Sequence, residues 1–152
     1  MSNENLYLYI LMRTDLPSMG AGRAAAQASH AANAFIHEHG NRDDVKAWQA
    51  QTPQGFGTAI VLGVTALNID VLFDLEHGNE EVAKGKVYDP DYVITVPSEV
   101  VPYIDDRKLN QFEVSPTDSS KYLFHRKEMT CAYIFGDKEK LKPLLSQFPL
   151  YS

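Results

Sequence analysis

The sequence predicts an α/β fold, and two observations support this class. In the first half of the chain, apolar segments typical of strands alternate with segments of helical periodicity, as in a layered α/β domain. The chain has 152 residues, of which 44% are hydrophobic, so it is long enough to bury one substantial core. We therefore expect a single domain over residues 1–152.

The first half contains two expected strands and three expected helices. Residues 6–13, LYLYILMR, carry apolar side chains on both sides of the pleat and predict a strand buried on both faces. Residues 56–64, FGTAIVLGV, predict a second buried strand. Helices are expected over residues 19–39, with Ser18 as its cap, over 43–51, and over 65–78, where Gly78 ends the apolar periodicity.

The second half is less regular and predicts shorter elements. Strands are expected over residues 92–96, 111–115 and 129–135. A helix capped by Ser98 is expected over residues 98–109, although Pro102 interrupts its pattern. Residues 137–148 predict an amphipathic helix capped by Asp137.

Composition excludes several classes of protein. The formal net charge is −6, so any contact with nucleic acid must use a local basic patch. Basic clusters occur at residues 121–127 and 138–142. Cys131 is the one cysteine, which excludes an internal disulfide and predicts a buried, inert thiol. The longest apolar run, residues 6–12, is too short to span a membrane, and we expect a cytoplasmic protein without a metal site.

The expected helix at residues 19–39 combines two features. It is rich in alanine, which allows close packing on a sheet, and Arg23, Gln27 and His30 follow one another on one face. Gly20 and Gly22 leave its first amides open, and a helix start of this kind suits a phosphate, a carboxylate or a developing oxyanion. From the residues alone, Arg23 also fits an ordinary surface arginine, and His30 a half-buried structural histidine.

The segment at residues 9–32, YILMRTDLPSMGAGRAAAQASHAA, resembles the opening of the type-2 peptidyl-tRNA hydrolases. In that family, a strand ending in R-x-D-L leads into a helix that reads about M-G-K-G-K-x-A-A-Q-x-x-H-A. The matching positions are Arg13, Asp15, Leu16, Met19, Gly20, Gly22, Ala25, Ala26, Gln27, His30 and Ala31. The two lysines of the family pattern fall at Ala21 and Arg23.

The end of the chain resembles the family less closely. The family carries a D-A-G-x-T turn and then a threonine that opens its last strand; Asp118 and Thr130 stand at the matching interval, with Tyr122 in place of the first threonine. The resemblance covers residues 6–65 and, more weakly, 115–151. It implies a mixed four-stranded sheet with helices on both faces, plus an insertion around residues 78–114.

The resemblance also implies a function, which is hydrolysis of the ester bond in peptidyl-tRNA by a homodimer without a cofactor. Catalysis would involve Arg23 at the ester carbonyl or a phosphate, Asp118 at the attacking water, and Thr130 at that water or the ribose. The residues expected to bind substrate are Arg13, Met19, Gly20, Gly22, Gln27, His30, Lys121, Tyr122, Arg126 and Lys127.

Two other functions remain open at this point. The lysine and threonine departures fit a catalytically silent module on the same fold that binds RNA or a protein partner. The acidic net charge fits a hydrolase of another small ester or amide.

Overall fold

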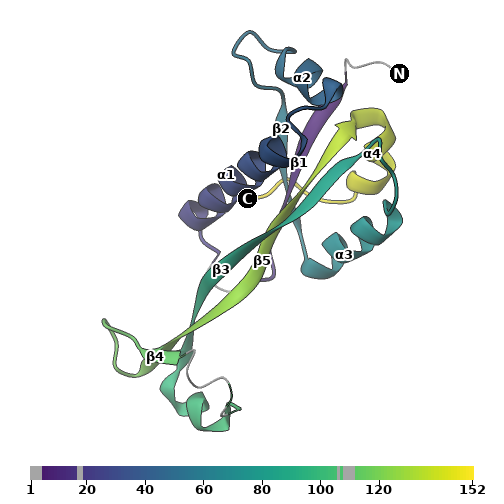
Figure 1. The fold of residues 1–152 in the computed structure, drawn as a ribbon. Coiled ribbons are helices and arrows are strands. Elements are labelled where there is room, and N and C mark those ends of the chain that lie inside the picture. The colour runs from purple at the N-terminus through teal and green to yellow at the C-terminus, as the bar shows by residue number, and fades with distance from the viewer. Residues whose placement is uncertain (1–4, 17–18, 106, 108–111) are drawn as a thin grey trace. The chain divides into compact units, whose positions relative to one another are not determined.

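The computed structural model describes residues 5–16, 19–105, 107 and 112–152 (Figure 1). In chain order the elements are β1 (Leu6–Arg13), α1 (Ala21–His39), α2 (Asp43–Gln49), β2 (Ala59–Val64), α3 (Ala66–Leu75), β3 (Ala83–Pro97), a 3₁₀ helix (Ser98–Tyr103), β4 (Phe112–Val114), β5 (Lys121–Asp137) and α4 (Lys138–Leu145).

These strands form one mixed sheet with the order β2-β1-β5-β3, and β4 pairs with β5. β1 runs parallel to β2, with Leu8 opposite Ala59 and Arg13 opposite Val64. It runs antiparallel to β5, from Leu6 opposite Asp137 to Met12 opposite Cys131. The predicted α/β class and mixed sheet are confirmed; in the described part of the chain the sheet has five strands rather than the predicted four, because short β4 joins the four on the main path.

Helices cover both faces of the sheet, as predicted. α1 and α2 pack on one face, where Phe35 and Trp48 contact alternate side chains of β1 and β5. α3 and α4 pack on the other face through Ile69 and Leu141. β1 is buried from end to end because both faces are covered, which explains its continuous apolar sequence.

Several predicted helix boundaries differ in the structure, and α2 and α4 end at Gln49 and Leu145, a few residues before the predicted 51 and 148. The N-cap of α1 is Gly20, while Ser18, which we expected to cap this helix, lies outside the described residues. α3 ends at Leu75 rather than at Gly78, which lies beyond the helix with a φ of 79°. The predicted Asp137 cap of α4 is confirmed, because its carboxylate accepts hydrogen bonds from the amides of Glu139 and Lys140.

The second half differs more from expectation. β3 and β5 have 15 and 17 residues, far longer than the strands predicted at 92–96 and 129–135. The helix expected from Ser98 is a 3₁₀ turn that contains Pro102, which lacks the amide needed to continue an α-helix. The strands are longer than predicted because β3 and β5 pair with each other through hydrogen bonds. Pairing between segments distant in the sequence leaves no signal in local periodicity.

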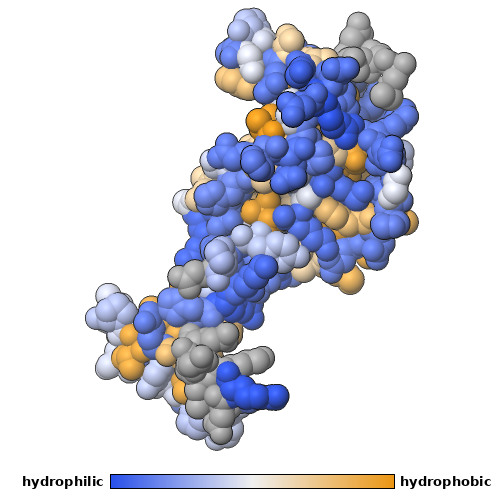
Figure 2. Space-filling view, viewed as in Figure 1, coloured by the Kyte–Doolittle hydropathy of each residue, from blue (hydrophilic) through white to orange (hydrophobic). Residues whose placement is uncertain are grey.

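The chain divides into two compact units. The first comprises residues 1–87 and 129–152, and the second comprises residues 88–128. The second unit begins and ends later than the insertion expected at 78–114. No described helix has the length and apolar character needed to cross a membrane. On the face seen in Figure 2, hydrophilic side chains predominate and apolar ones are interspersed among them.

Candidate functional site

The first unit brings two helix starts to one end of the sheet. β1 and β2 are parallel, so their carboxyl ends lie at the same edge, and α1 and α3 follow these strands. The loop after β1 is fixed to the end of β2, because both the amide and the hydroxyl of Thr14 donate to the carbonyl of Val64, at 2.8 and 3.2 Å. Ligands of α/β proteins bind at such carboxyl ends, which makes this edge the candidate site.

The start of α1 is open within the described part of the chain. Gly20 is its N-cap and adopts an extended conformation. No described heavy atom lies within 4 Å of a Cβ built at Gly20 or Gly22, so neither glycine is required by packing. Arg23 is half-buried in the first turn. The positive end of α1 therefore combines two open glycine positions with an arginine in the first turn, an arrangement that favours an anion.

The polar residues of α1 separate into buried and exposed positions. Gln27 is 5% exposed, whereas His30 is exposed rather than the half-buried histidine that the sequence also allowed. Thr130 on β5 is fully buried, and its hydroxyl donates to Oε1 of Gln27 at 2.8 Å. The Cys131 thiol contacts the carbonyl oxygen of Gln27 at 3.5 Å. Gln27 and Thr130 thus join α1 to the sheet from inside the protein.

Cys131 is buried, as predicted, and burial raises the pKa of its thiol to about 11. The thiol is therefore protonated at neutral pH, and it lacks the thiolate character that nucleophilic catalysis requires. This cysteine is a core residue.

Arg13 lies at the end of β1 and is 8% exposed. Its Nε and Nη2 donate to the two carboxylate oxygens of Asp15, at 2.9 and 3.2 Å, and its Nη1 donates to the carbonyl of Met129 at 2.8 Å. Asp15 also accepts from the amide of Ala66 at 3.4 Å, the first residue of α3. The hydrogen bond from Arg13 is the main cause that holds the pKa of Asp15 below its usual range.

A groove of about 330 Å³ runs beside the first turns of α1. Its walls are small and apolar, because α1 presents alanines there, and the C-terminal residues close one side. The lining residues are Met12, Ala21, Ala24, Ala25, Ala28, Val61, Tyr151 and Ser152. The Tyr151 hydroxyl contacts the carbonyl oxygen of Met19 at 3.5 Å, which connects the tail to the loop before α1.

Five predicted site residues belong to the second unit. The carboxylate of Asp118 accepts from the hydroxyl and the amide of Ser120, at 2.6 and 3.0 Å, and these bonds lower its pKa. Its other oxygen lies 3.8 Å from Nζ of Lys121. Tyr122 is half-buried and pairs with Val114 in the ladder between β4 and β5.

The other two basic residues of this unit that were predicted to bind substrate contact aromatic rings. Arg126 forms an ion pair with Glu128 at 2.8 Å and lies over the ring of Phe124. The ammonium group of Lys127 lies 5.0 Å from the ring centre of Tyr88. The ion pair with Glu128 offsets the charge of Arg126, whereas the contact with the uncharged ring of Tyr88 leaves Lys127 cationic.

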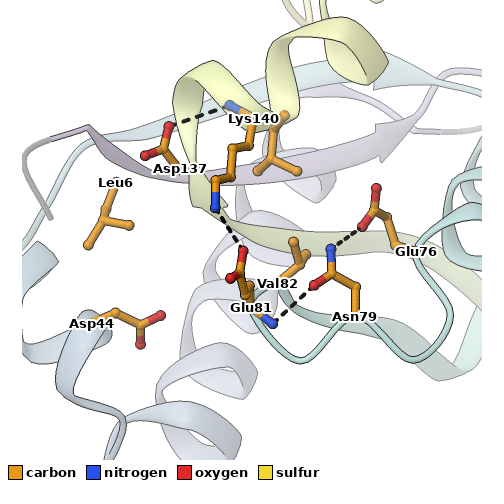
Figure 3. Close-up of a pocket in the computed structure, with 9 residues that line it drawn as sticks. Leu6, Asp44, Glu76, Asn79, Glu81, Val82, Asp137 and Lys140 are labelled. Atoms are coloured by element: carbon orange, nitrogen blue, oxygen red, sulfur yellow. Dashed lines mark hydrogen bonds and ion pairs between the residues drawn. The ribbon is translucent and has the colours of Figure 1, made fainter. Parts of the chain in front are cut away.

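A separate small cavity, of about 50 Å³, lies at the opposite end of β1, beside Leu6 (Figure 3). Acidic side chains predominate in its lining, but they are engaged: Glu81 pairs with Lys140 at 2.8 Å, and Glu76 accepts from Asn79 at 2.7 Å. Among the described residues, no group of three or more His, Cys, Asp or Glu side chains is arranged to hold a metal ion.

Residues 6–71 match the family model of peptidyl-tRNA hydrolase PTH2. This segment is similar to the type-2 peptidyl-tRNA hydrolases. The match contains β1, α1, α2, β2 and the first part of α3, so it includes both helix starts of the candidate site. The comparison with curated proteins found no match.

Residues 6–71, the family segment, contain Arg23, Gln27 and His30, whereas Asp118 and Thr130 lie beyond them. The structure brings Thr130 to Gln27 and fixes Arg13 beside Met129. Sequence reasoning missed the role of Asp15, although the residue stands in the R-x-D-L run. The available signal was that Asp15 follows Arg13 by two positions, because residues of opposite charge at this spacing near the end of a strand can form an ion pair.

Proposed function

We propose that this chain hydrolyses the ester bond between the peptide and the tRNA in peptidyl-tRNA. The observation that carries the proposal is the start of α1 within residues 6–71, at the carboxyl edge of β1 and β2, where Gly20 and Gly22 are open and Arg23 stands in the first turn. Amides and a guanidinium at this point suit the negative charge that develops on the carbonyl oxygen of an ester under attack. They suit a backbone phosphate of tRNA equally well.

Each proposed residue has a distinct task. Arg23 stabilises the developing oxyanion or a neighbouring phosphate. Asp118 orients the attacking water; its lowered pKa keeps it an ionised hydrogen-bond acceptor at neutral pH. Because the Thr130 hydroxyl and the Gln27 amide are bonded to each other inside the protein, we assign them to holding α1 against β5. His30 is exposed on α1 and is assigned to substrate contact.

The remaining parts of the substrate have proposed places as well. The apolar groove beside α1 offers space for the peptide, next to the helix start where the ester carbonyl would bind. Lys121, Arg126 and Lys127, with Tyr122 between them, are proposed to contact the tRNA backbone. We also propose a homodimer that acts in the cytoplasm, where translation supplies peptidyl-tRNA.

The test is release of labelled peptide from an N-blocked aminoacyl-tRNA. We expect turnover by the wild-type chain, a loss of about 100-fold in Arg23→Ala, and substantial retention in Arg23→Lys, because a single oxyanion donor contributes on this scale. Asp118→Asn is also expected to reduce turnover strongly, whereas Asp74→Asn, an exposed carboxylate on α3, serves as its matched control.

Other outcomes would identify another function. If the wild-type chain binds tRNA but releases no peptide, it is a silent binding module. If it neither binds tRNA at moderate salt nor releases peptide, a small ester or amide becomes the better substrate class. Neutralising Lys121 or Lys127 should make tRNA binding less dependent on salt concentration. With one phosphate contact fewer, the protein releases fewer counterions when it binds tRNA.

A further inference from the structure

Two arginines of this chain make the same set of contacts in different places, and we call this set of contacts a clamp. Arg13 and Arg42 each bind an aspartate two residues later through two hydrogen bonds, and each also donates to a distant backbone carbonyl. For Arg13 that carbonyl belongs to Met129 on β5. For Arg42 it belongs to Glu81, in the turn before β3, at 3.1 Å.

The Arg13 clamp lies where β5 departs from regular alternation. In a regular strand, residues two apart point to the same face. Met129, however, packs in the core cluster beneath α3 and α4, whereas Cys131 packs in the cluster beneath α1 and α2. The consecutive residues Thr130 and Cys131 both contact Gln27 of α1. A local irregularity between Met129 and Cys131 therefore directs two successive side chains toward α1.

The ladder between β1 and β5 runs as far as Met12 opposite Cys131. Directly beyond it, the Met129 carbonyl accepts its hydrogen bond from the Arg13 side chain. This bond is charge-assisted and largely shielded from water, since the side chain of Arg13 is 10% exposed. Asp15 fixes the guanidinium through both carboxylate oxygens and reaches the first amide of α3.

We propose that Arg13 and Asp15 are positioning residues that hold the 129–131 segment of β5 in the irregular conformation required to seat α1. The pair connects β1, β5 and the start of α3, and through Thr130 and Gln27 it fixes the helix whose N-terminus forms the candidate site. Its effect on turnover rests on the proposed function. Its effect on the conformation of β5 does not, and can be measured separately.

Cys131 provides the independent measurement, because it is the one cysteine of the chain and is buried inside the proposed irregularity. Labelling of this thiol by iodoacetamide under native conditions reports local opening of β5 at this point. We expect Arg13→Met to label about tenfold faster than wild type or more, because a charge-assisted bond to a shielded carbonyl is lost. Arg13→Lys should lie between them, since lysine keeps the charge but not the two-pronged geometry.

Arg42→Met is the matched control, with the same pair geometry and the same type of carbonyl contact at another place in the fold. We expect its Cys131 labelling to stay within about twofold of wild type, because opening is local to the site disturbed. Unchanged labelling in Arg13→Met would overturn the proposal, and so would equal acceleration in both variants, which would indicate general loosening. If Arg13→Met does not fold, Arg13→Lys and Asp15→Asn decide the matter by the same labelling measurement.

Turnover adds a second readout. In Arg13→Met we expect kcat for peptidyl-tRNA to fall while KM changes by less than about threefold, with partial rescue in Arg13→Lys, as for a residue that positions the reacting groups. A rise in KM with kcat unchanged would contradict a positioning role. If wild type releases no peptide, the proposed function fails, and the labelling comparison still tests the clamp.

Discussion

α1 and α3 begin at the same edge of the sheet, but their N-termini are capped differently. At α3, Thr65 and Asn68 form a reciprocal capping box, and the Asp15 carboxylate approaches the next amide. At α1, the N-cap is Gly20, which has no side chain, and the first turn carries Arg23 instead of an acid. A carboxylate thus meets the positive end of one helix, and a cation stands at the positive end of the other.

This difference shows which helix start serves stability and which is available for a ligand. Side chains of the protein accept from the amides of Asn68 and Ala66 at the start of α3, so this end gains less from an external anion. The start of α1 instead has two open glycine positions and an arginine in its first turn, and a cation at this end of a helix lowers helix stability. The comparison predicts that changes at α1 alter activity, whereas changes at α3 alter stability.

The largest expected effect comes from reversing the charge at α1. Arg23→Glu should reduce peptide release by about 100-fold or more, because it replaces a donor to the oxyanion with a like charge. The same change should raise the unfolding free energy by roughly 0.3–1 kcal/mol, since an acid is favourable in the first turn of a helix. Peptide release and denaturant unfolding measure the two effects. A variant that loses activity and stability together would contradict the comparison.

The matching change at α3 should have the opposite profile. Thr65→Ala removes the side-chain oxygen that accepts from the amide of Asn68, at 3.2 Å. We expect the free energy of unfolding to fall by about 1 kcal/mol, the usual cost of losing an N-cap, with kcat unchanged. Denaturant unfolding measures the first and peptide release the second. A strong loss of kcat in a folded Thr65→Ala protein would place α3 in the active site.

A smaller effect concerns pH and Asp15, whose pKa is lowered, first of all, by the hydrogen bond from Arg13. A carboxyl with a lower pKa in the folded state stabilises the protein above its unfolded pKa, and this contribution disappears as pH falls through the folded value. Wild type should therefore lose stability in the acid range, below the ordinary carboxyl pKa, more steeply than Asp15→Asn. Denaturant unfolding between pH 7 and about 3 tests this, since carboxyl groups titrate in that range. Parallel curves would contradict it.

The smallest expected effect comes from capping α1 as α3 is capped. Gly20→Ser supplies a hydroxyl for the open amides, and serine exceeds glycine at this position by only a few tenths of a kcal/mol. Stability should rise by about that amount, while peptide release should fall because the hydroxyl competes with the substrate for the same donors. Increased turnover in Gly20→Ser would show that these amides do not bind the ester.

The sequence predicted the local elements well. β1 has the predicted bounds, and α1, α2 and α4 lie close to theirs, because apolar periodicity and capping residues act within a few positions. Trp48, on α2, is 5% exposed and contacts Phe35 and Phe135. The motif at residues 9–32 indicated the family that the match over residues 6–71 supports.

What the sequence determined by itself was therefore the α/β class, the first strand, the helix that follows it, and the similarity of this segment to the type-2 peptidyl-tRNA hydrolases. Tertiary structure decided the rest, since contacts between residues far apart in the chain leave no periodic signal. Thr130 meets Gln27 across 103 positions, and Arg13 meets Met129 across 116. The lengths of β3 and β5 depend on their pairing with each other. Packing likewise decides whether a polar residue is buried against a partner or exposed to solvent. Gln27 and His30 are three residues apart on one helix, yet Gln27 is buried and His30 is exposed.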